Sequence, residues 1–304
     1  MATSQWRLIV SICLLAFVSF SAKVVSAETD KPPFYQVQWQ GKTAYLLGSI
    51  HIGRADFYPL PAQIETALSK ARGLVVEVDI NKADSTALLQ QYGRADKTKG
   101  LDWQSRDKQT VQIMSRYCAA TANVCQSIQS FAPWLQATQV NLMRYNTLGY
   151  STDYGVDMQL MARHAALPVY QLETAESQFQ LLASFDSQEQ WSMVREAISA
   201  SDVDLLSLIT AWRSGNETEL DSIMQEQMGG EGDTQMLEKI LWQRNHVMAD
   251  GIITLMGSAE VAVPLFVVVG AGHVVGDKSV VQRLKQAGAK VSACWKEACE
   301  PLRQ

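Results

Sequence analysis

Residues 264–273 have the sequence Pro-Leu-Phe-Val-Val-Val-Gly-Ala-Gly-His and contain the strongest strand signal in the chain. A short apolar run between proline and glycine is typical of a strand that is buried on both faces of a parallel sheet. A second run of this kind, Leu74-Val-Val-Glu-Val78, lies between Gly73 and Asp79. Weaker runs at 168–172 and 289–293 predict two further strands.

Helical patterns separate these strands. Alternating residues at 34–39 and 43–47 predict a β-hairpin with its turn at 40–42. A helix is expected after Pro61 and another over 277–286, and helical patterns fill 84–165 and 174–257. Strands alternating with helices imply βαβ crossovers. We therefore expect an α/β fold, a mixed and largely parallel sheet covered by helices, whose long central helical block forms a cap or subdomain.

The first 27 residues have the pattern of a secretory signal peptide. Arg7 precedes an apolar run over 8–18, and small residues follow up to Ala27. A retained membrane anchor is the alternative, but the run is short for a bilayer span. Cleavage after Ala27 would leave one domain over 28–304 in the periplasm or secreted, without a stable membrane span.

Composition excludes several classes of protein. The full sequence has 304 residues, 47% of them hydrophobic and 19% charged, which is typical of a globular domain rather than a disordered one. Its formal net charge of −5 argues against a nucleic-acid partner, which requires a basic surface. A peptide or a small molecule is the expected substrate, and the oligomeric state is not predicted.

Four of the five cysteines form two close pairs, Cys118/Cys125 and Cys294/Cys299. An exported protein meets an oxidising compartment, so two local disulfides are favoured over a zinc site. Residues seven apart in one continuous helix are separated by about 10 Å, too far for a disulfide. The chain must therefore turn between Cys118 and Cys125.

Four candidate site residues lie at or just after predicted strands. His51 follows the strand that ends near Gly48, and His273 follows Gly270 at the same spacing. Glu77 and Glu173 lie at the ends of two other strands. Ligands of open α/β sheets bind at the carboxyl ends of the strands, and imidazole can bind a metal or transfer a proton near neutral pH.

Structural roles remain open for several of these groups. A carboxylate at Glu77 could be buried in an ion pair with Arg72 or Arg244. Glu173 and Asp157 could each cap a helix. Arg244 and Asn245, late in a long helix, could present a guanidinium and an amide to an anion. His164 and His246 lie inside helical patterns and are interpreted as structural.

Other catalytic motifs are missing from the sequence. It contains no Gly-x-Ser-x-Gly elbow, no His-Glu-x-x-His helix and no Walker-type phosphate loop. Three glycines in 270–276 suggest a dinucleotide loop. That loop, however, belongs to the last βα unit, which leaves no room for the acidic ribose partner. No nucleotide cofactor is expected.

The chain resembles the TraB/GumN/TIKI family over essentially its whole predicted mature length. The resemblance rests on paired Gly-x-x-His motifs and on neighbouring stretches, namely residues 45–53, 57–61, 74–79, 149–150, 155–157, 172–174, 244–245 with Met248, and 268–276. It implies a fold distantly similar to the erythromycin-esterase and ChaN-like proteins. Animal members are described as metal-dependent proteases that act on secreted signals.

The resemblance implies that His51, Glu77 and His273 are the metal ligands and catalytic groups. Glu173, Arg244 and Asn245 are the implied supporting site residues. One position departs from the family, which often has Glu-Arg-Asn where this chain has Gln243 before Arg244.

The expected function is an exported hydrolase that cleaves a peptide or ester bond with the help of a divalent metal. Zinc, manganese and cobalt are not distinguished, since imidazole and carboxylate suit all three. Metal-free acid–base chemistry is an alternative within this hypothesis. The rival functions are a non-catalytic protein that binds a metal, haem or a small ligand, and a structural or inhibitory partner.

Overall fold

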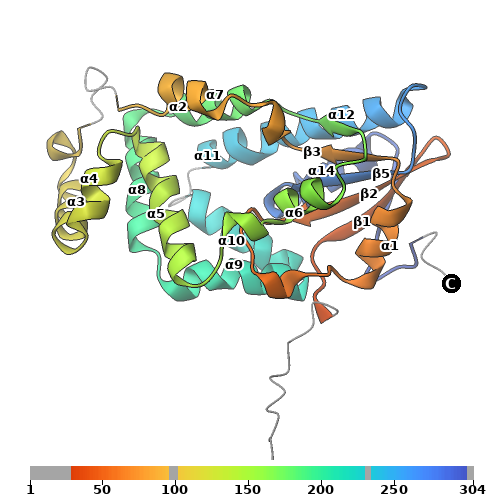
Figure 1. The fold of residues 1–304 in the computed structure, drawn as a ribbon, viewed down its shortest axis with the longest axis horizontal. Coiled ribbons are helices and arrows are strands. Elements are labelled where there is room, and N and C mark those ends of the chain that lie inside the picture. The colour runs from red at the N-terminus through yellow and green to blue at the C-terminus, as the bar shows by residue number, and fades with distance from the viewer. Residues whose placement is uncertain (1–28, 96–101, 230–233, 300–304) are drawn as a thin grey trace, which may run out of the picture.

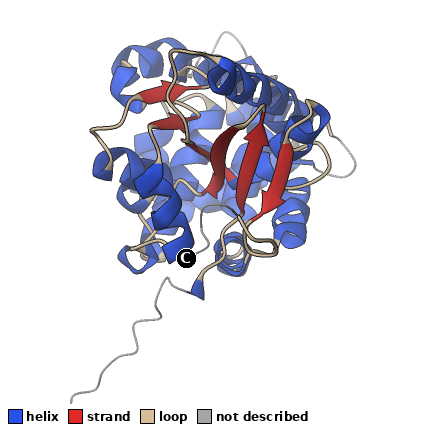
Figure 2. Ribbon diagram, turned by 90° about the vertical axis from the view of Figure 1, so that its right-hand side faces the viewer, coloured by secondary structure: helices blue, strands red, loops and turns tan. Residues whose placement is uncertain are grey.

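A six-stranded mixed sheet forms the centre of the molecule, as the computed structural model shows for residues 29–95, 102–229 and 234–299. The predicted leader lies outside these described residues. The strands are β1 (Phe34–Trp39), β2 (Lys42–Ser49), β3 (Gly73–Val76), β4 (Val169–Gln171), β5 (Leu265–Gly270) and β6 (Lys290–Ala293). Their order in the sheet is β4-β3-β5-β2-β1-β6. Figure 2 shows helices on either side of this sheet.

The expected α/β class is confirmed, and so is the largely parallel sheet. Strands β4, β3, β5 and β2 are parallel to one another, and β1 pairs antiparallel with both β2 and β6. The side chains of Leu265 to Val269 in β5 are fully buried, as their continuous apolar run predicts for a central parallel strand.

The hairpin turn is tighter than predicted. Gln40 and Gly41 alone form the turn, both with positive φ, and Lys42 already belongs to β2. Two-residue turns with positive φ at both positions match the twist of the paired strands, which explains the shorter loop. Strand β3 likewise ends at Val76, so Glu77 lies just beyond the strand rather than within it.

Helices make up most of the remaining chain. They are η2 (Ala55–Phe57), α1 (Ala62–Lys70), η3 (Ile80–Lys82), α2 (Ser85–Tyr92), η5 (Trp103–Ser105), α3 (Lys108–Ala120), α4 (Ala122–Ile128), α5 (Pro133–Thr147), η6 (Thr152–Tyr154), α6 (Val156–Arg163), α7 (Ala175–Ser184), α8 (Ser187–Ser199), α9 (Asp202–Ser214), α10 (Glu217–Gly229), α11 (Gln235–Leu237), the π-helical turn η7 (Glu238–Trp242), α12 (Gln243–Gly257), α13 (Ala271–Val274) and α14 (Val280–Gln286).

The central helices pack in two groups. Trp212 of α9 and Ile252 of α12 belong to the large core around the sheet, whereas Met114 of α3 and Trp191 of α8 belong to a separate cluster. In Figure 1, α3, α4, α5 and α8 accordingly lie at the left end of the molecule, away from the sheet on the right. Within the described residues, no helix combines the length and the apolar character needed to cross a membrane.

Both expected disulfides are present. Cys118 is bonded to Cys125 across a break at Thr121 between α3 and α4, and the two Cα atoms lie 5.2 Å apart. Cys294 is bonded to Cys299 around the turn that follows β6, with a Cα separation of 5.3 Å. The break at Thr121 is the turn that the spacing of the first pair required.

In oxidised protein lacking the leader, thiol titration should detect no free cysteine without reduction. Replacing Cys118 and Cys125 together by serine should lower the free energy of unfolding by about 2 kcal/mol, because each bridge closes only a short loop. Urea denaturation measures this loss, and the Cys294/Cys299 double variant is the matched comparison. Detection of two or four thiols in the native protein would contradict the pairing.

Candidate functional site

The carboxyl ends of four parallel strands meet at one edge of the sheet. In the sheet register, Ser49 of β2 pairs with Gly270 of β5, and Val76 of β3 pairs with both Val268 of β5 and Gln171 of β4. His51, Glu77, Glu173 and His273 all follow within three residues of these strand ends. The structure therefore brings together four residues that are far apart in the sequence.

Glu77 is the buried centre of this group. Its Oε1 accepts a hydrogen bond from the backbone N–H of Gly270 and lies 3.7 Å from Nε2 of His273. Burial by itself raises the pKa of Glu77. Interactions with His273, His51 and Arg244, together with the Gly270 N–H, outweigh burial and hold that pKa below its usual range. Glu77 is therefore an ionised carboxylate at neutral pH.

Arg244 joins the two glutamates of the site. Its Nη2 donates to Glu173 Oε2 at 2.6 Å and to Glu77 Oε2 at 3.1 Å, and its Nε donates to both oxygens of Glu173. Gln178 of α7 also donates to both carboxylates. The structural alternative for Glu77, an ion pair with Arg244, is thus present in the same site. Helix α7 is capped by Thr174, which leaves Glu173 to pair with Arg244.

His51 is held by Asp157. Its Nδ1 lies 2.8 Å from Oδ2 of Asp157, whose other oxygen accepts a hydrogen bond from Ser49 Oγ at 2.7 Å. The carboxylate of Asp157 raises the pKa of His51 to about 9. Burial alone would raise the pKa of Asp157, but its bonds to His51 and Ser49 bring it below the usual range. The His51 side chain is 69% exposed, so its Nε2 edge is accessible.

A close backbone approach places Asp157 beside His51. The N–H of Val156 donates to the carbonyl of Ile50, and a Cβ at Gly155 would lie 2.5 Å from the carbonyl oxygen of His51. Only glycine allows this approach, which docks the first turn of α6 against the loop after β2. The sequence offered helix capping as a role for Asp157 and missed its contact with His51, although Gly155-Val-Asp157 was part of the family resemblance.

His273 is buried and has a fixed tautomer. Its Nδ1 lies 2.6 Å from Oδ1 of Asn245, whose Nδ2 donates to the carbonyl of Lys278 at 2.9 Å. The bond from Nδ2 to Lys278 fixes the orientation of the Asn245 amide. Oδ1 is therefore the acceptor, and Nδ1 of His273 must carry the proton. Burial lowers the pKa of His273 to about 4, so the ring is neutral at neutral pH and its Nε2 lone pair faces Glu77.

The side chains of Glu77 and both histidines come close to Gly270. A Cβ at Gly270 would lie 3.1 Å from Glu77 Oε1, 3.6 Å from Cδ2 of His273 and 3.8 Å from Nε2 of His51. Glycine suits this position because the Glu77 carboxylate and the two imidazole rings leave little room for a Cβ.

Comparison with known proteins identifies the family. The family model described as TraB/PrgY/gumN family matches residues 33–293. The chain belongs to this family. The TraB/PrgY/gumN match spans β1 to β6 and includes every strand that contributes to the site.

Two curated relatives from this comparison are named only as uncharacterized proteins. The chain is 28% identical over 142 residues to "Uncharacterized protein YbaP" of Shigella flexneri, a match covering 46% of the chain and 51% of the relative. It is also 28% identical over 141 residues to the protein of that name in Escherichia coli K12, covering 45% and 51%. The chain spans about half the length of these relatives, and no solved structure matched it.

A cleft of about 260 Å³ opens next to the site of this TraB/PrgY/gumN chain. His51, Glu77, Asp157 and Gln178 form its polar side. Gln178 was not predicted, since one glutamine in a helical pattern carries no chemical signal before the fold brings α7 to Glu77.

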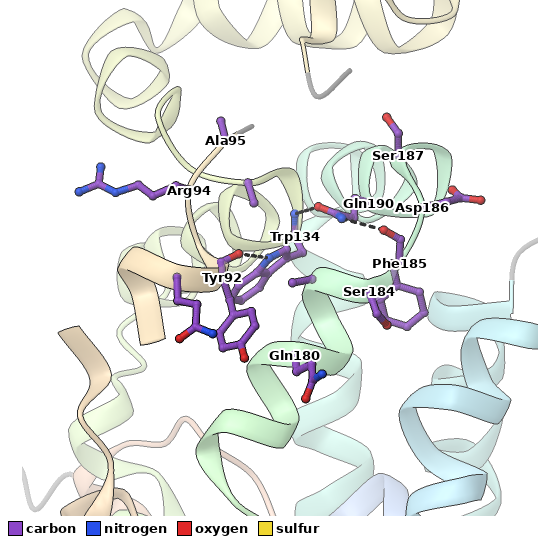
Figure 3. Close-up of a pocket in the computed structure, with 13 residues that line it drawn as sticks. Tyr92, Arg94, Ala95, Trp134, Gln180, Ser184, Phe185, Asp186, Ser187 and Gln190 are labelled. Carbon is purple, nitrogen blue, oxygen red and sulfur yellow. Dashed lines mark hydrogen bonds between the residues drawn. The ribbon is translucent and has the colours of Figure 1, made fainter. Parts of the chain in front are cut away.

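A larger cavity lies elsewhere, between α2, α5, α7 and α8 (Figure 3). Its volume is about 710 Å³, and none of the predicted site residues lines it. The polar groups at its centre already bond to one another, since Trp134 Nε1 donates to the carbonyl of Tyr92 and Gln190 Nε2 donates to that of Phe185. No histidine is among the described residues that line this cavity.

The paired histidines should titrate far apart. In protein treated with a chelator, NMR of the imidazole carbons should give a midpoint near pH 9 for His51, while His273 stays neutral at pH 7. Asp157→Asn should move the His51 midpoint down toward 6.5, because the stabilising charge is removed. Asp153→Asn, in the exposed turn before α6, is the control. A wild-type midpoint near 6.5 would contradict the His51–Asp157 pair.

Proposed function

We propose that this TraB/PrgY/gumN chain is an exported hydrolase that cleaves a peptide or ester bond next to His51, Glu77 and His273. The observation that carries the proposal is the convergence of two imidazole rings and an ionised carboxylate around Gly270. Each ring is held through Nδ1, His51 by Asp157 and His273 by Asn245. Each Nε2 is therefore left to act on a substrate or an ion.

The opposite pKa shifts of the two histidines assign them different roles. His51 is cationic at neutral pH and can donate a proton from Nε2 to a leaving group or to a developing oxyanion. His273 is neutral, and its Nε2 lone pair and Glu77 Oε1 are two acceptors 3.7 Å apart. A water molecule between them would donate to both acceptors and be positioned for attack on a carbonyl carbon.

The supporting residues keep Glu77 charged and in place. Arg244 neutralises part of the charge of Glu77 and Glu173, so two buried carboxylates are stable side by side. The Gly270 N–H holds Oε1 in place through a hydrogen bond. Glu173 therefore acts through Arg244, as a positioning residue, rather than on the substrate.

His273 Nε2 and Glu77 Oε1 are also donor atoms of the kinds that bind a divalent ion. Imidazole nitrogen and carboxylate oxygen are common zinc ligands, and two such ligands of a tetrahedral ion lie about 3.4 Å apart, close to the His273–Glu77 separation. The described part of the chain contains no complete group of three or more ligand residues at binding distance. His51, Glu77 and His273 would hold the ion, which would lower the pKa of a bound water and polarise a carbonyl.

Hydrolysis can be tested with fluorogenic peptide amides and p-nitrophenyl esters. His51→Ala, His273→Ala and Glu77→Gln should each lower kcat/KM by about 100-fold or more, because each removes a group that transfers or positions a proton. His246→Ala, one residue from Asn245 but exposed on α12, is the matched control and should retain activity. Full activity in the His51/His273 double variant would refute the catalytic assignment.

Metal dependence has a separate test. In isothermal titration calorimetry, chelator-treated protein should bind about one equivalent of Zn²⁺, Mn²⁺ or Co²⁺, and both His51→Ala and His273→Ala should abolish binding. Unchanged uptake in both variants would refute the metal-assisted version. Turnover in the presence of EDTA would then support metal-free acid–base chemistry, whereas binding without turnover would favour a metal-binding protein.

A further inference from the structure

The wall of the cleft opposite its polar side is apolar. It consists of Val76, Val78, Ile80, Met158 and Met161. Such a wall is not required to hold the histidines or the carboxylates, all of which have polar partners. It is therefore available to contact a substrate.

The apolar residues are attached directly to the site residues. Met158 follows Asp157, which holds His51, and Met161 lies one helical turn further along the same face of α6. Ile80 starts the short helix η3, three residues after Glu77. A group that contacts Met158 and Ile80 is thus within the same small cleft as the His51 and Glu77 side chains.

Two of these residues are unusually exposed for their type. Ile80 is 43% exposed and Met158 is 38% exposed, whereas Met161 and Val76 form the buried floor at 8% and 1%. Isolated exposed apolar residues are common on protein surfaces. Two of them that line one cleft with a histidine and a buried carboxylate are instead typical of a ligand-binding pocket, where apolar walls surround a few polar groups.

Size and charge restrict what the cleft accepts. Its volume of about 260 Å³ is below the roughly 300 to 1,000 Å³ of pockets for drug-sized ligands, so it has room for one side chain and not for a macrocycle. The described residues that line it include no Lys or Arg, and the negative charges of Glu77 and Asp157 are paired with Arg244 and His51. An acidic substrate group would find no Lys or Arg in this lining to pair with.

We propose that Ile80, Met158 and Met161 form a specificity pocket for an uncharged apolar side chain, of the size of leucine or methionine, next to the bond that is cleaved. The proposal rests on the hydrolase function proposed above and adds its substrate class. Methionine side chains are flexible and polarizable, so the pocket accepts several apolar shapes rather than one.

Binding is tested first, without catalysis. Protein labelled with ¹³C at the methionine methyl groups is titrated with N-acetyl-leucine amide, N-acetyl-alanine amide and N-acetyl-aspartate amide. The Met158 and Met161 signals, assigned with Met158→Leu and Met161→Leu, should shift with the leucine probe and much less with the other two. The remaining methionine signals provide the internal control. Unshifted Met158 and Met161 signals at saturating leucine probe would overturn the pocket.

Turnover is tested with peptide amides that differ only in the residue before the fluorogenic group. kcat/KM should be at least about tenfold higher for the leucine substrate than for the alanine and aspartate substrates. One methylene group in an apolar pocket changes kcat/KM by about 10- to 200-fold. Met158→Gln should remove most of this preference and leave the alanine substrate largely unchanged. Met143→Gln, in α5 and away from the cleft, should retain the preference.

The outcomes separate the two proposals. Hydrolysis of all substrates at equal rates, or a preference unchanged by Met158→Gln, would overturn the pocket while the hydrolase proposal stands. Methyl shifts with the leucine probe but no turnover of any substrate would support the pocket as a binding site and refute the hydrolase proposal.

Discussion

The buried carboxylate of Glu77 is the constraint around which the site is arranged. An ionised carboxylate away from water requires compensation, and here it comes from the Gly270 N–H and the Arg244 guanidinium. Arg244 in turn requires Glu173, because one carboxylate would not satisfy its planar donors. The charge of Glu77 thus ties β3, β4, β5 and α12 to a single edge of the sheet.

The two histidines show how environment shifts the pKa of one chemical group in opposite directions. His51 is exposed and bonded to an acid, so its pKa rises, whereas His273 is buried and bonded to an amide, so its pKa falls. The two Gly-x-x-His motifs are equivalent in sequence, but the partner of each Nδ1 makes them different. The proposed acid–base route depends on this difference, whereas metal binding would require Nε2 of both histidines to be unprotonated.

The sequence predicted most of the fold because its strands are chemically distinct. The apolar run 265–269 and the hairpin at 34–47 lie where expected, and Gly215 ends α9 in the left-handed conformation as a helix terminus favours. It did not predict which helices cover the sheet. Helices α9 and α12 pack in the main core, whereas α3 and α8 do not. The apolar faces of these helices look alike in the sequence, so the sequence does not show which of them faces the sheet.

By itself, the sequence determined that His51, Glu77, Glu173 and His273 follow strand ends. Parallel strands bring their carboxyl ends to the same edge, so this step requires only strand order along the chain. Only the tertiary structure decided that Asp157 holds His51 and that Met158 and Ile80 share its cleft. These contacts depend on how α6 docks against the loop after β2. There Gly155 approaches the backbone of His51, which is about 100 residues away in the chain, so no local sequence pattern reveals the contact.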